Sequence, residues 1–586
     1  MNYKLNTREA DTIKEPIWVA LARLVPLMRG EGGKVAIAFA AILMTSGLAL
    51  AAPLIISHII DSFITTKNYP GLFSWSGLLL ALFLVGLVSS YVQTRTMGGV
   101  GRRILFNLRH AVFTKLQDLP VAFFNENRAG DLISRINNDT DKLNQFFAQA
   151  LLQFLGNVFL IVGAGVLLLV LNVRLGAVAL VPAALVLVIT QLVAGWVKRA
   201  SFKSLQTLGS MSGEIQESLA NFKVIVAFNR LDYFRDKFRT ANAANYAASI
   251  RAGIAGNIFI PLYALAAALG QLAVLAYGIG LVSTGQISIG LLIGFLFYVL
   301  NFYTPLRQLA TIWASLQLAL AGLDRISEVL ALTSNLVTLP AEPATAAGPL
   351  LAFENVSFHY PGGRSVLRAV NFTLERGKTY ALVGPTGGGK TTTASLMARL
   401  YDPAEGRITL DGRDIRTLTP EARAARIGFI LQEPFLFTGT VRDNISYGDR
   451  AIAALSDAAL TARLDAAGLS ALLSRFDQGL DTPVSSAGDS MSLGQKQLIA
   501  FIRAALRQPD LLVLDEATAN IDTVTEQLLG TILAQLPKTT TKVIIAHRLN
   551  TIENADEIFF VNTGSVTKAG SLNDAVNLLL HRKRES

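Results

Sequence analysis

The sequence contains no cysteine among its 586 residues. Without thiols the chain can form no disulfide bond, bind no metal through thiolates and use no cysteine nucleophile, and the redox compartment cannot be read from it. Charged residues are also scarce, at 16%, whereas hydrophobic residues make up 51% of the chain. Because an ordinary soluble domain carries about 25% charged residues, we expect part of this chain to lie in a membrane.

Long runs almost free of charge account for this composition, and there are six of them. Each is long enough to cross a hydrocarbon layer as a helix, which takes about 20 residues. Six crossings return the chain to the side of the membrane on which it began. The predicted spans are 34–60, 73–97, 147–171, 175–197, 256–283 and 288–313.

The connections between these spans differ in charge. Residues 91–147 and 196–252 are rich in Lys and Arg, whereas the three opposite connections carry only Lys67 and Arg174. By the positive-inside rule the two basic connections and both termini are cytoplasmic, and we expect a multi-pass protein of a prokaryotic plasma membrane. This pattern also explains the net charge of +10 without nucleic acid as a partner.

Both basic connections are about fifty residues long and hold few helix breakers. We therefore predict that the membrane helices continue into the cytoplasm and turn back near Gly130-Asp131 and Ala220-Asn221. These two turns are candidates for contact with a soluble domain.

Four parts follow from these patterns. Residues 1–33 are a cytoplasmic segment with an interfacial helix and no signal peptide, and residues 34–320 form an all-α membrane domain with six transmembrane helices. Residues 321–349 are a linker, and residues 350–586 form a soluble domain. Short β-rich runs alternate with helical stretches in this last part, which predicts an α/β sheet domain fused to the membrane domain.

A glycine-rich loop lies between a predicted strand, Tyr380–Val383, and a predicted helix that begins at Thr392. It fits the pattern G-x-x-x-x-G-K-[ST], whose backbone N–H groups surround phosphates. Lys390 would reach the outer phosphates and Thr391 would bind Mg²⁺. We therefore predict an α/β P-loop ATPase that binds ATP and Mg²⁺ through Gly384, Pro385, Thr386, Gly387, Gly388, Gly389, Lys390, Thr391 and Thr392.

A second motif follows about 125 residues later, where the apolar run Leu511–Leu514 ends in two carboxylates. An acid at such a strand end holds Mg²⁺, and a second acid can polarise the attacking water. We assign Asp515 to the metal and Glu516 to the water.

Further motifs occur in a fixed order around these: Gln432, the segment Met491–Gln495 and His547. With them the chain resembles a half-transporter of the ATP-binding cassette (ABC) exporter superfamily over residues 15–586. The resemblance implies that Tyr360 stacks on adenine and that His547 contacts the γ-phosphate. By the same resemblance, Gln432 contacts Mg²⁺ and relays the state of the metal to the membrane domain. It also implies that Ser492, Gly494 and Gln495 close on the ATP of a second subunit and that Asp522 bridges the dimer.

The signature motif Met491–Gln495 and the segment Val484–Gly488 before it depart from the family pattern. Leu493 replaces a glycine of the signature motif, and Ser486 replaces the usual coupling glutamate. Because the signature serves the partner's nucleotide, the chain resembles one subunit of a heterodimeric exporter with unequal sites. We therefore expect a second ABC half-transporter as its partner, with a heterodimer favoured over a homodimer.

The expected function is ATP-driven export of amphiphilic or apolar compounds across the plasma membrane by alternating access. Import of a large chelate, such as a siderophore, by the same fold is the alternative, and the sequence does not separate the two. A nucleic-acid-repair ATPase is disfavoured by the six apolar spans. A fused cysteine peptidase is excluded because the chain has no cysteine.

Overall fold

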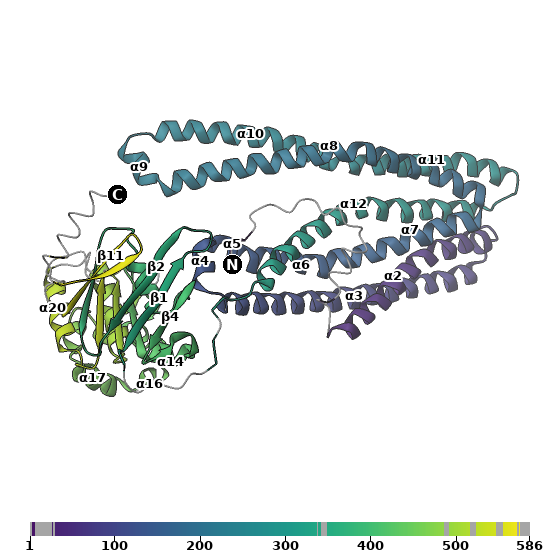
Figure 1. Cartoon of the computed structure of the whole chain (residues 1–586). Helices are drawn as coiled ribbons and strands as arrows, with labels where there is room; N and C mark the ends of the chain where they lie inside the picture. The colour runs from purple at the N-terminus through teal and green to yellow at the C-terminus, as the bar shows by residue number, and fades with distance from the viewer. Residues whose placement is uncertain are drawn as a thin grey trace. The chain divides into compact units, whose positions relative to one another are not determined.

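The structure is a computed structural model that describes residues 3–5, 26, 30–336, 338–340, 348–485, 491–515, 523–545, 555–570 and 574. Its contacts divide the chain into two compact units (Figure 1). The helical unit comprises Asn6–Leu116 and Gly130–Ala331, and the α/β unit comprises Met1–Leu5, Gln117–Ala129 and Leu332–Ser586. The predicted interfacial helix, within residues 1–33, lies outside the described residues.

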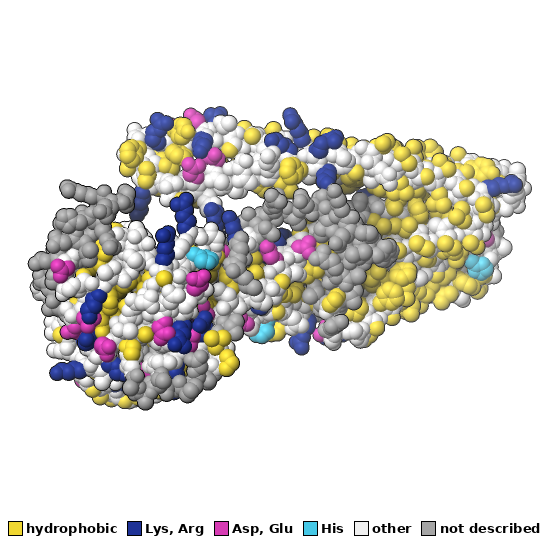
Figure 2. All heavy atoms as spheres, viewed as in Figure 1, with side chains coloured by type: hydrophobic (Ala, Val, Ile, Leu, Met, Phe, Trp, Pro, Cys, Tyr) yellow, Lys and Arg dark blue, Asp and Glu magenta, His cyan; other side chains and the backbone are white. Residues whose placement is uncertain are grey.

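Among the described residues, six helices are long and apolar enough to cross a membrane, which confirms the predicted number of spans. Figure 2 shows hydrophobic side chains over much of the surface of these helices, as lipid-facing helices require. The helices are α2 (Gly32–Ile59), which continues as η2 (Ile60–Ile64), then α3 (Tyr69–Gln117), α7 (Leu151–Leu171), α8 (Val173–Ala220), α11 (Phe259–Ser283) and α12 (Ile289–Ala331).

The two basic connections are helical, as predicted. α3 and α8 run for 49 and 48 residues without interruption, far beyond the length that a membrane requires. The first turn consists of α4 (Val121–Glu126), α5 (Ala129–Ser134), η3 (Arg135–Asp139), α6 (Thr140–Gln145) and η4 (Phe146–Ala150). The second consists of α9 (Phe222–Ala227), and α10 (Leu231–Asn257) leads back.

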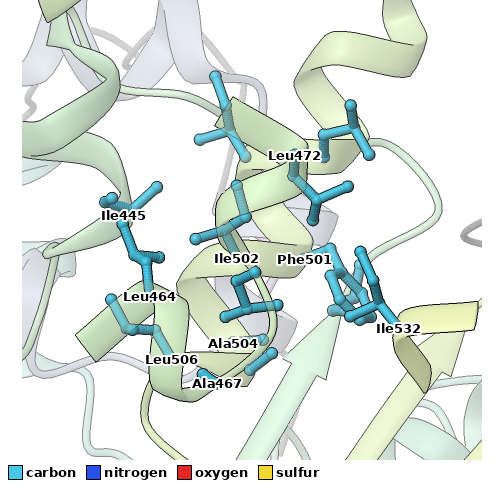
Figure 3. Packing of buried hydrophobic residues seen from close by; sticks show 14 of the residues in the cluster. Ile445, Leu464, Ala467, Leu472, Phe501, Ile502, Ala504, Leu506 and Ile532 are labelled. Atoms are coloured by element: carbon cyan, nitrogen blue, oxygen red, sulfur yellow. The ribbon is translucent and has the colours of Figure 1, made fainter. Parts of the chain in front are cut away.

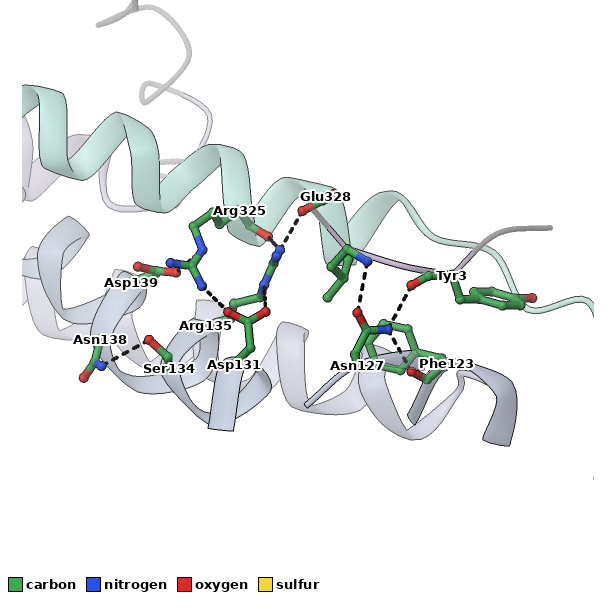
Figure 4. A network of polar contacts seen from close by, with 11 residues as sticks. Tyr3, Phe123, Asn127, Asp131, Ser134, Arg135, Asn138, Asp139, Arg325 and Glu328 are labelled. Carbon is green, nitrogen blue, oxygen red and sulfur yellow. Dashed lines mark hydrogen bonds and ion pairs between the residues drawn. The ribbon is translucent and has the colours of Figure 1, made fainter. Parts of the chain in front are cut away.

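α12 continues through the expected boundary at residue 320 and ends at Ala331. A network of charges lies along this extension (Figure 4). Arg135, which is 1% exposed, binds Asp131 at 3.0 Å and Glu328 at 2.8 Å. Arg325 binds Asp131 and, at 3.2 Å, Asp139. These contacts join the last turns of α12 to α5 and η3 inside the helical unit.

The α/β unit contains a six-stranded sheet in the order β12-β11-β3-β10-β9-β6 and an antiparallel sheet in the order β2-β1-β4-β5. The strands of the first sheet are β3 (Thr379–Val383), β6 (Ile427–Ile430), β9 (Leu511–Asp515), β10 (Thr541–Ile545), β11 (Glu557–Asn562) and β12 (Ser565–Ala569). Those of the second are β1 (Leu351–His359), β2 (Ser365–Leu374), β4 (Glu405–Leu410) and β5 (Arg413–Asp414). β7 (Gly439–Thr440) and β8 (Pro483–Val484) form a small ribbon.

One core of the α/β unit surrounds the amphipathic helix α19 (Leu493–Ala505). Its residues Phe501 and Ile502 pack with Ile445, Leu472 and Ile532 from neighbouring helices (Figure 3). Each such side chain contributes about 1.5–3 kcal/mol on burial. Besides α4, the described helices of this unit are α13 (Lys390–Met397), η5 (Ile415–Thr417), α14 (Pro420–Arg426), α15 (Val441–Ile445), α16 (Arg450–Ala453), α17 (Asp457–Ala466), α18 (Ser470–Leu473), η6 (Gly479–Asp481), α19 and α20 (Thr523–Gln535).

Candidate nucleotide-binding site

The site is built where parallel strands of the six-stranded sheet end. In the register of this sheet, Ile545 of β10 lies opposite Leu382 of β3 and Asp515 of β9, and Ile430 of β6 lies opposite Leu514. The carboxyl ends of all four strands therefore meet at one edge, which is where open α/β sheets bind ligands. This topology brings the glycine loop after β3 and the carboxylate that ends β9 together.

The backbone of the glycine loop requires glycine. Gly384, Gly387 and Gly389 have φ values of 149°, 81° and 111°. Residues that carry a Cβ rarely adopt this region of φ, whereas glycine adopts it readily. Packing adds a second constraint, because a Cβ on Gly384 or Gly388 would lie 2.0 or 2.6 Å from the carbonyl oxygen of Val561 in β11. The loop thus lies directly against β11 and leads into α13.

Lys390 is 5% exposed and turns back over its own loop. Its Nζ donates to the carbonyl oxygens of Gly384 at 2.9 Å and Pro385 at 3.1 Å. The ammonium group is therefore held against the glycine loop at the N-terminus of α13, where a phosphate would be bound by the cation and by the helix N-terminus.

Thr391 and Asp515 are in contact, as the predicted metal site requires. The hydroxyl of Thr391 donates to Asp515 Oδ1 at 3.3 Å, although 124 residues separate the two. A hydroxyl and a carboxylate are the oxygen ligands that Mg²⁺ prefers, and Mg²⁺ at such sites is completed by phosphate oxygens and water. Together with Lys390 this donor set fits Mg²⁺ and ATP. Among the described residues no cluster of three His, Asp or Glu side chains offers another metal site.

Tyr360 follows β1 and lies beside α13. Its hydroxyl is 3.0 Å from Thr392 Oγ1, and its ring meets those of Phe358 and Tyr401 edge to face, at 5.0 and 5.2 Å. Tyr360 is half-buried, and its stacking on adenine stays a prediction, as does the contact of Thr392 with nucleotide.

Tyr401 and Asn125 join this site to α4, and local sequence patterns do not reveal this pairing. Asn125 in α4 donates to the Tyr401 hydroxyl at 2.7 Å across 276 residues of sequence. Burial raises the pKa of Tyr401, and the hydrogen bond from Asn125 opposes that rise, so the phenol is neutral at physiological pH. α4 therefore contacts Tyr401 within the α/β unit. A contact of the predicted turn at Gly130-Asp131 with this unit stays a prediction, as does the approach of that turn to Gln432.

The signature residues begin α19. Ser492 Oγ accepts a hydrogen bond from the backbone N–H of Gln495 at 3.2 Å, and the Gln495 side chain accepts one from the N–H of Ser492 at 3.0 Å. This capping box explains why the helix starts here. Ser492 is exposed, and Gly494 is the second residue of the helix. The contact of Ser492, Gly494 and Gln495 with a second subunit's nucleotide stays a prediction.

Gln432 lies in the exposed loop two residues beyond β6, at the edge where the site is built. Glu516, Asp522 and His547, for which catalytic or bridging roles are predicted, lie outside the described residues, as does Ser486. Their roles stay predictions.

Comparison with known proteins gives two family matches. Residues 35–306 match the profile of the ABC transporter transmembrane region, and residues 367–519 match that of the ABC transporter. These two matches cover the apolar helices and the glycine loop with Asp515.

Three relatives span most of the chain. An uncharacterised ABC transporter ATP-binding protein of Bacillus subtilis, YfiC, is 34% identical over 95% of this chain and 92% of its own. A fatty acid ABC transporter ATP-binding/permease protein of Mycobacterium bovis is 33% identical over 84% of this chain and 78% of its own. A multidrug resistance ABC transporter ATP-binding and permease protein of Lactococcus lactis is 31% identical over 85% and 84%.

Proposed function

Because the chain belongs to the ABC transporter family, as an exporter-type half-transporter, we propose that it exports amphiphilic or apolar compounds across the plasma membrane by alternating access. Coupling of ATP hydrolysis to transport by a multi-pass membrane protein follows from the family. The observation that supports the proposal best is the placement of Lys390 inside the glycine loop and of Thr391 against Asp515, in a chain with six apolar spans.

Each side chain of the site has a defined task in this proposal. Lys390 neutralises charge on the outer phosphates, and Thr391 and Asp515 hold Mg²⁺, which offsets the charge of the triphosphate. Glu516 orients and polarises the attacking water. Gln432 and His547 sense the metal and the γ-phosphate, and Tyr360 holds the adenine ring. ATP supplies the free energy.

Two relatives support the substrate class. One name refers to fatty acids, which are amphiphilic, and the other refers to multidrug resistance. The exposed hydrophobic surface of the membrane helices suits compounds that arrive from the bilayer.

Transport into sealed vesicles tests the direction. Inside-out vesicles expose the nucleotide domain, so an exporter accumulates a fluorescent amphiphile in their lumen when Mg²⁺ and ATP are added outside. Vesicles with Lys390→Ala serve as the control and should accumulate none. ATP-dependent loss of a preloaded siderophore from the same vesicles, without accumulation of amphiphiles, would favour the importer instead.

We also propose that the working unit is a heterodimer. The altered signature around Leu493 and Ser486 would weaken both sites of a homodimer but only one site of a heterodimer, in which the partner supplies an intact signature opposite Glu516. The purified chain alone should then hydrolyse ATP slowly, and activity should appear with a second half-transporter. Robust hydrolysis by the chain alone, stimulated by transported compounds, would contradict the heterodimer.

A further inference from the structure

A hollow of about 530 Å³ lies between α8 and α10 in the helical unit. It is lined by one face of each helix, since the lining residues recur at intervals of three and four positions. Ala200, Ala247 and Ala248 lie at the centre of these faces, and their small side chains leave the space between the two helices open. The lining residues are Trp196, Arg199, Ala200, Lys203 and Thr207 of α8, and Ala244, Ala247, Ala248, Arg251 and Ile254 of α10.

The charge of this hollow has one sign. Arg199, Lys203 and Arg251 line it, and no acidic side chain does. Within the described residues neither Arg199 nor Arg251 has a hydrogen bond or an ion pair, while Lys203 donates only to Gln206, at 3.1 Å. Three cations that share one hollow without a counter-charge favour an anionic ligand.

The hollow lies at the level where the predicted spans 175–197 and 256–283 meet the cytoplasm. Trp196 and Ile254 mark the apolar side of this boundary, and the three cations lie just beyond it. Figure 2 shows the same change, from hydrophobic surface to Lys and Arg, along the surface of the helical unit. Tryptophan with neighbouring cations is the composition that places a ligand at the level of lipid headgroups.

Polar contacts join α8 and α10 beside the cations of the hollow. Ser204 lies 3.2 Å from Ser249, hydroxyl to hydroxyl, and Thr207 donates to Asn245 at 3.4 Å. These contacts hold α8 and α10 together at the level of Lys203 and Arg251.

We propose that this hollow binds the anionic head of an amphiphile, a phosphate or a carboxylate, with the acyl chain lying along Trp196 and Ile254 in the bilayer. Arg199 and Arg251 bind the head, and Lys203 adds a third positive charge. The ligand is either a resident phospholipid or a free anionic amphiphile on its way into the transporter. The site does not depend on the direction of transport, so its test is independent of the transport assay.

Fluorescence quenching tests the site in the full-length chain. Trp196 becomes the only tryptophan when Trp18, Trp75 and Trp313 are replaced by phenylalanine. Brominated phosphatidylglycerol and a brominated fatty acid should then quench Trp196 at lower concentrations than brominated phosphatidylcholine. Stronger quenching by phosphatidylglycerol identifies a resident lipid, and stronger quenching by the fatty acid identifies a free amphiphile.

Charge removal gives the second measurement. The variant Arg199→Ala with Arg251→Ala should weaken anionic quenching about 25-fold, or about fivefold per cation, since one cation near a membrane contributes about 1 kcal/mol. The control, Lys223→Ala with Arg239→Ala, removes two cations outside the hollow and should leave quenching unchanged. Added salt should weaken anionic quenching of the chain with native arginines, which tests the site even where the variant fails to fold. Equal quenching by phosphatidylcholine and phosphatidylglycerol, or equal losses in variant and control, would overturn the proposal.

Discussion

The side-chain amide of Asn301 in α12 donates a hydrogen bond of 3.1 Å to the backbone carbonyl of Ala49 in α2. Ala49 lies four residues before Pro53, which is inside α2 and has no N–H to donate to that carbonyl. Tyr298, one turn earlier on α12, donates to the next carbonyl, that of Leu50, at 2.6 Å. α12 therefore supplies the hydrogen bonds to α2 at its proline, in a region where lipid offers none.

This relationship predicts a dependence between two substitutions. Asn301→Leu should leave the Ala49 carbonyl unpaired and lower the free energy of unfolding by about 1–3 kcal/mol. In a chain that also carries Pro53→Ala, the restored N–H pairs with that carbonyl, and Asn301→Leu should cost less by at least about 1 kcal/mol. Thermal unfolding of the four proteins in detergent measures the difference. Asn257→Leu is the control, because Asn257 bonds to Gly253 of its own helix. Strictly additive effects of Pro53→Ala and Asn301→Leu would show that the bond does not serve Pro53.

A second prediction concerns the contact between Asn125 and Tyr401. Tyr401 also touches Tyr360, whose hydroxyl is close to Thr392 in α13, so these residues link α4 to the helix that follows the glycine loop. Tyr401→Phe removes the acceptor for Asn125 and should reduce the stimulation of ATP hydrolysis by transported compounds about two- to tenfold, the equivalent of one hydrogen bond. ATP affinity should change less.

Tyr447→Phe is a matched control for this experiment, since the Tyr447 ring stacks on Phe437 and not on Tyr360. Stimulated and basal hydrolysis are measured with both variants in lipid. If Tyr401→Phe responds to transported compounds like the control, Asn125 and Tyr401 play no part in coupling.

The glycine loop gives a third prediction. A Cβ on Gly388 would meet two backbone oxygens, those of Val561 at 2.6 Å and Pro385 at 3.1 Å, so the loop itself must move. Gly388→Ala should weaken ATP binding by at least about tenfold, because the loss of one well-placed contact worth about 1.4 kcal/mol has that effect. Gly530→Ala in α20 meets nothing within 4 Å and should bind ATP normally, with equal or slightly higher stability. Titration with a fluorescent ATP analogue compares the two, and normal binding by Gly388→Ala would contradict the packing argument.

Local patterns in the sequence were enough to predict the glycine loop, the six spans and the strands on either side of the site, Tyr380–Val383 and Leu511–Leu514, because each depends on neighbouring residues. β2 was not predicted because the alternation of exposed and buried residues that marks a strand is broken along it. Arg368 and Ala369, for example, are consecutive and both exposed. Contacts between distant residues leave no local sign. Asn125 and Tyr401 are 276 residues apart, and Asn301 and Ala49 are 252 residues apart. The extension of α12 to Ala331 was missed because Arg325 and Glu328 bind residues almost 200 positions earlier.

The charges around Glu557 predict a dependence on pH. Hydrogen bonds from Lys568 and Lys378, at 2.8 and 2.9 Å, hold the pKa of Glu557 below its usual range. Because its pKa is lowered, Glu557 binds fewer protons in the folded chain than in the unfolded chain. The two lysines therefore stabilise the fold fully above the unfolded pKa of Glu557, which is about 4.3. This stabilisation is lost as the pH falls through the lower pKa of the folded chain. Glu557→Gln should therefore lower stability at neutral pH, by less than about 1 kcal/mol for such a surface pair.

Thermal unfolding of Glu557→Gln and of the unsubstituted chain between about pH 3.5 and 8 tests this. The difference between them should be constant above about pH 5.5 and should shrink below about pH 4.5. Glu421→Gln, on the exposed side of α14, controls for the loss of an acid at the surface. A difference that grows as the pH falls would have the wrong sign.

The most direct test of the account is ATP binding and turnover by the chain purified from its native membrane together with any subunit that accompanies it. Glu516→Gln keeps the shape of the side chain but cannot polarise water as a carboxylate does. It should bind ATP with nearly unchanged affinity and release phosphate at least about 100-fold more slowly, as expected when a catalytic base is lost. Lys390→Ala should instead weaken binding itself, since its ammonium group lies inside the glycine loop. Phosphate release by Glu516→Gln at the rate of the unsubstituted chain would contradict the assignment of this site as the ATPase that drives transport.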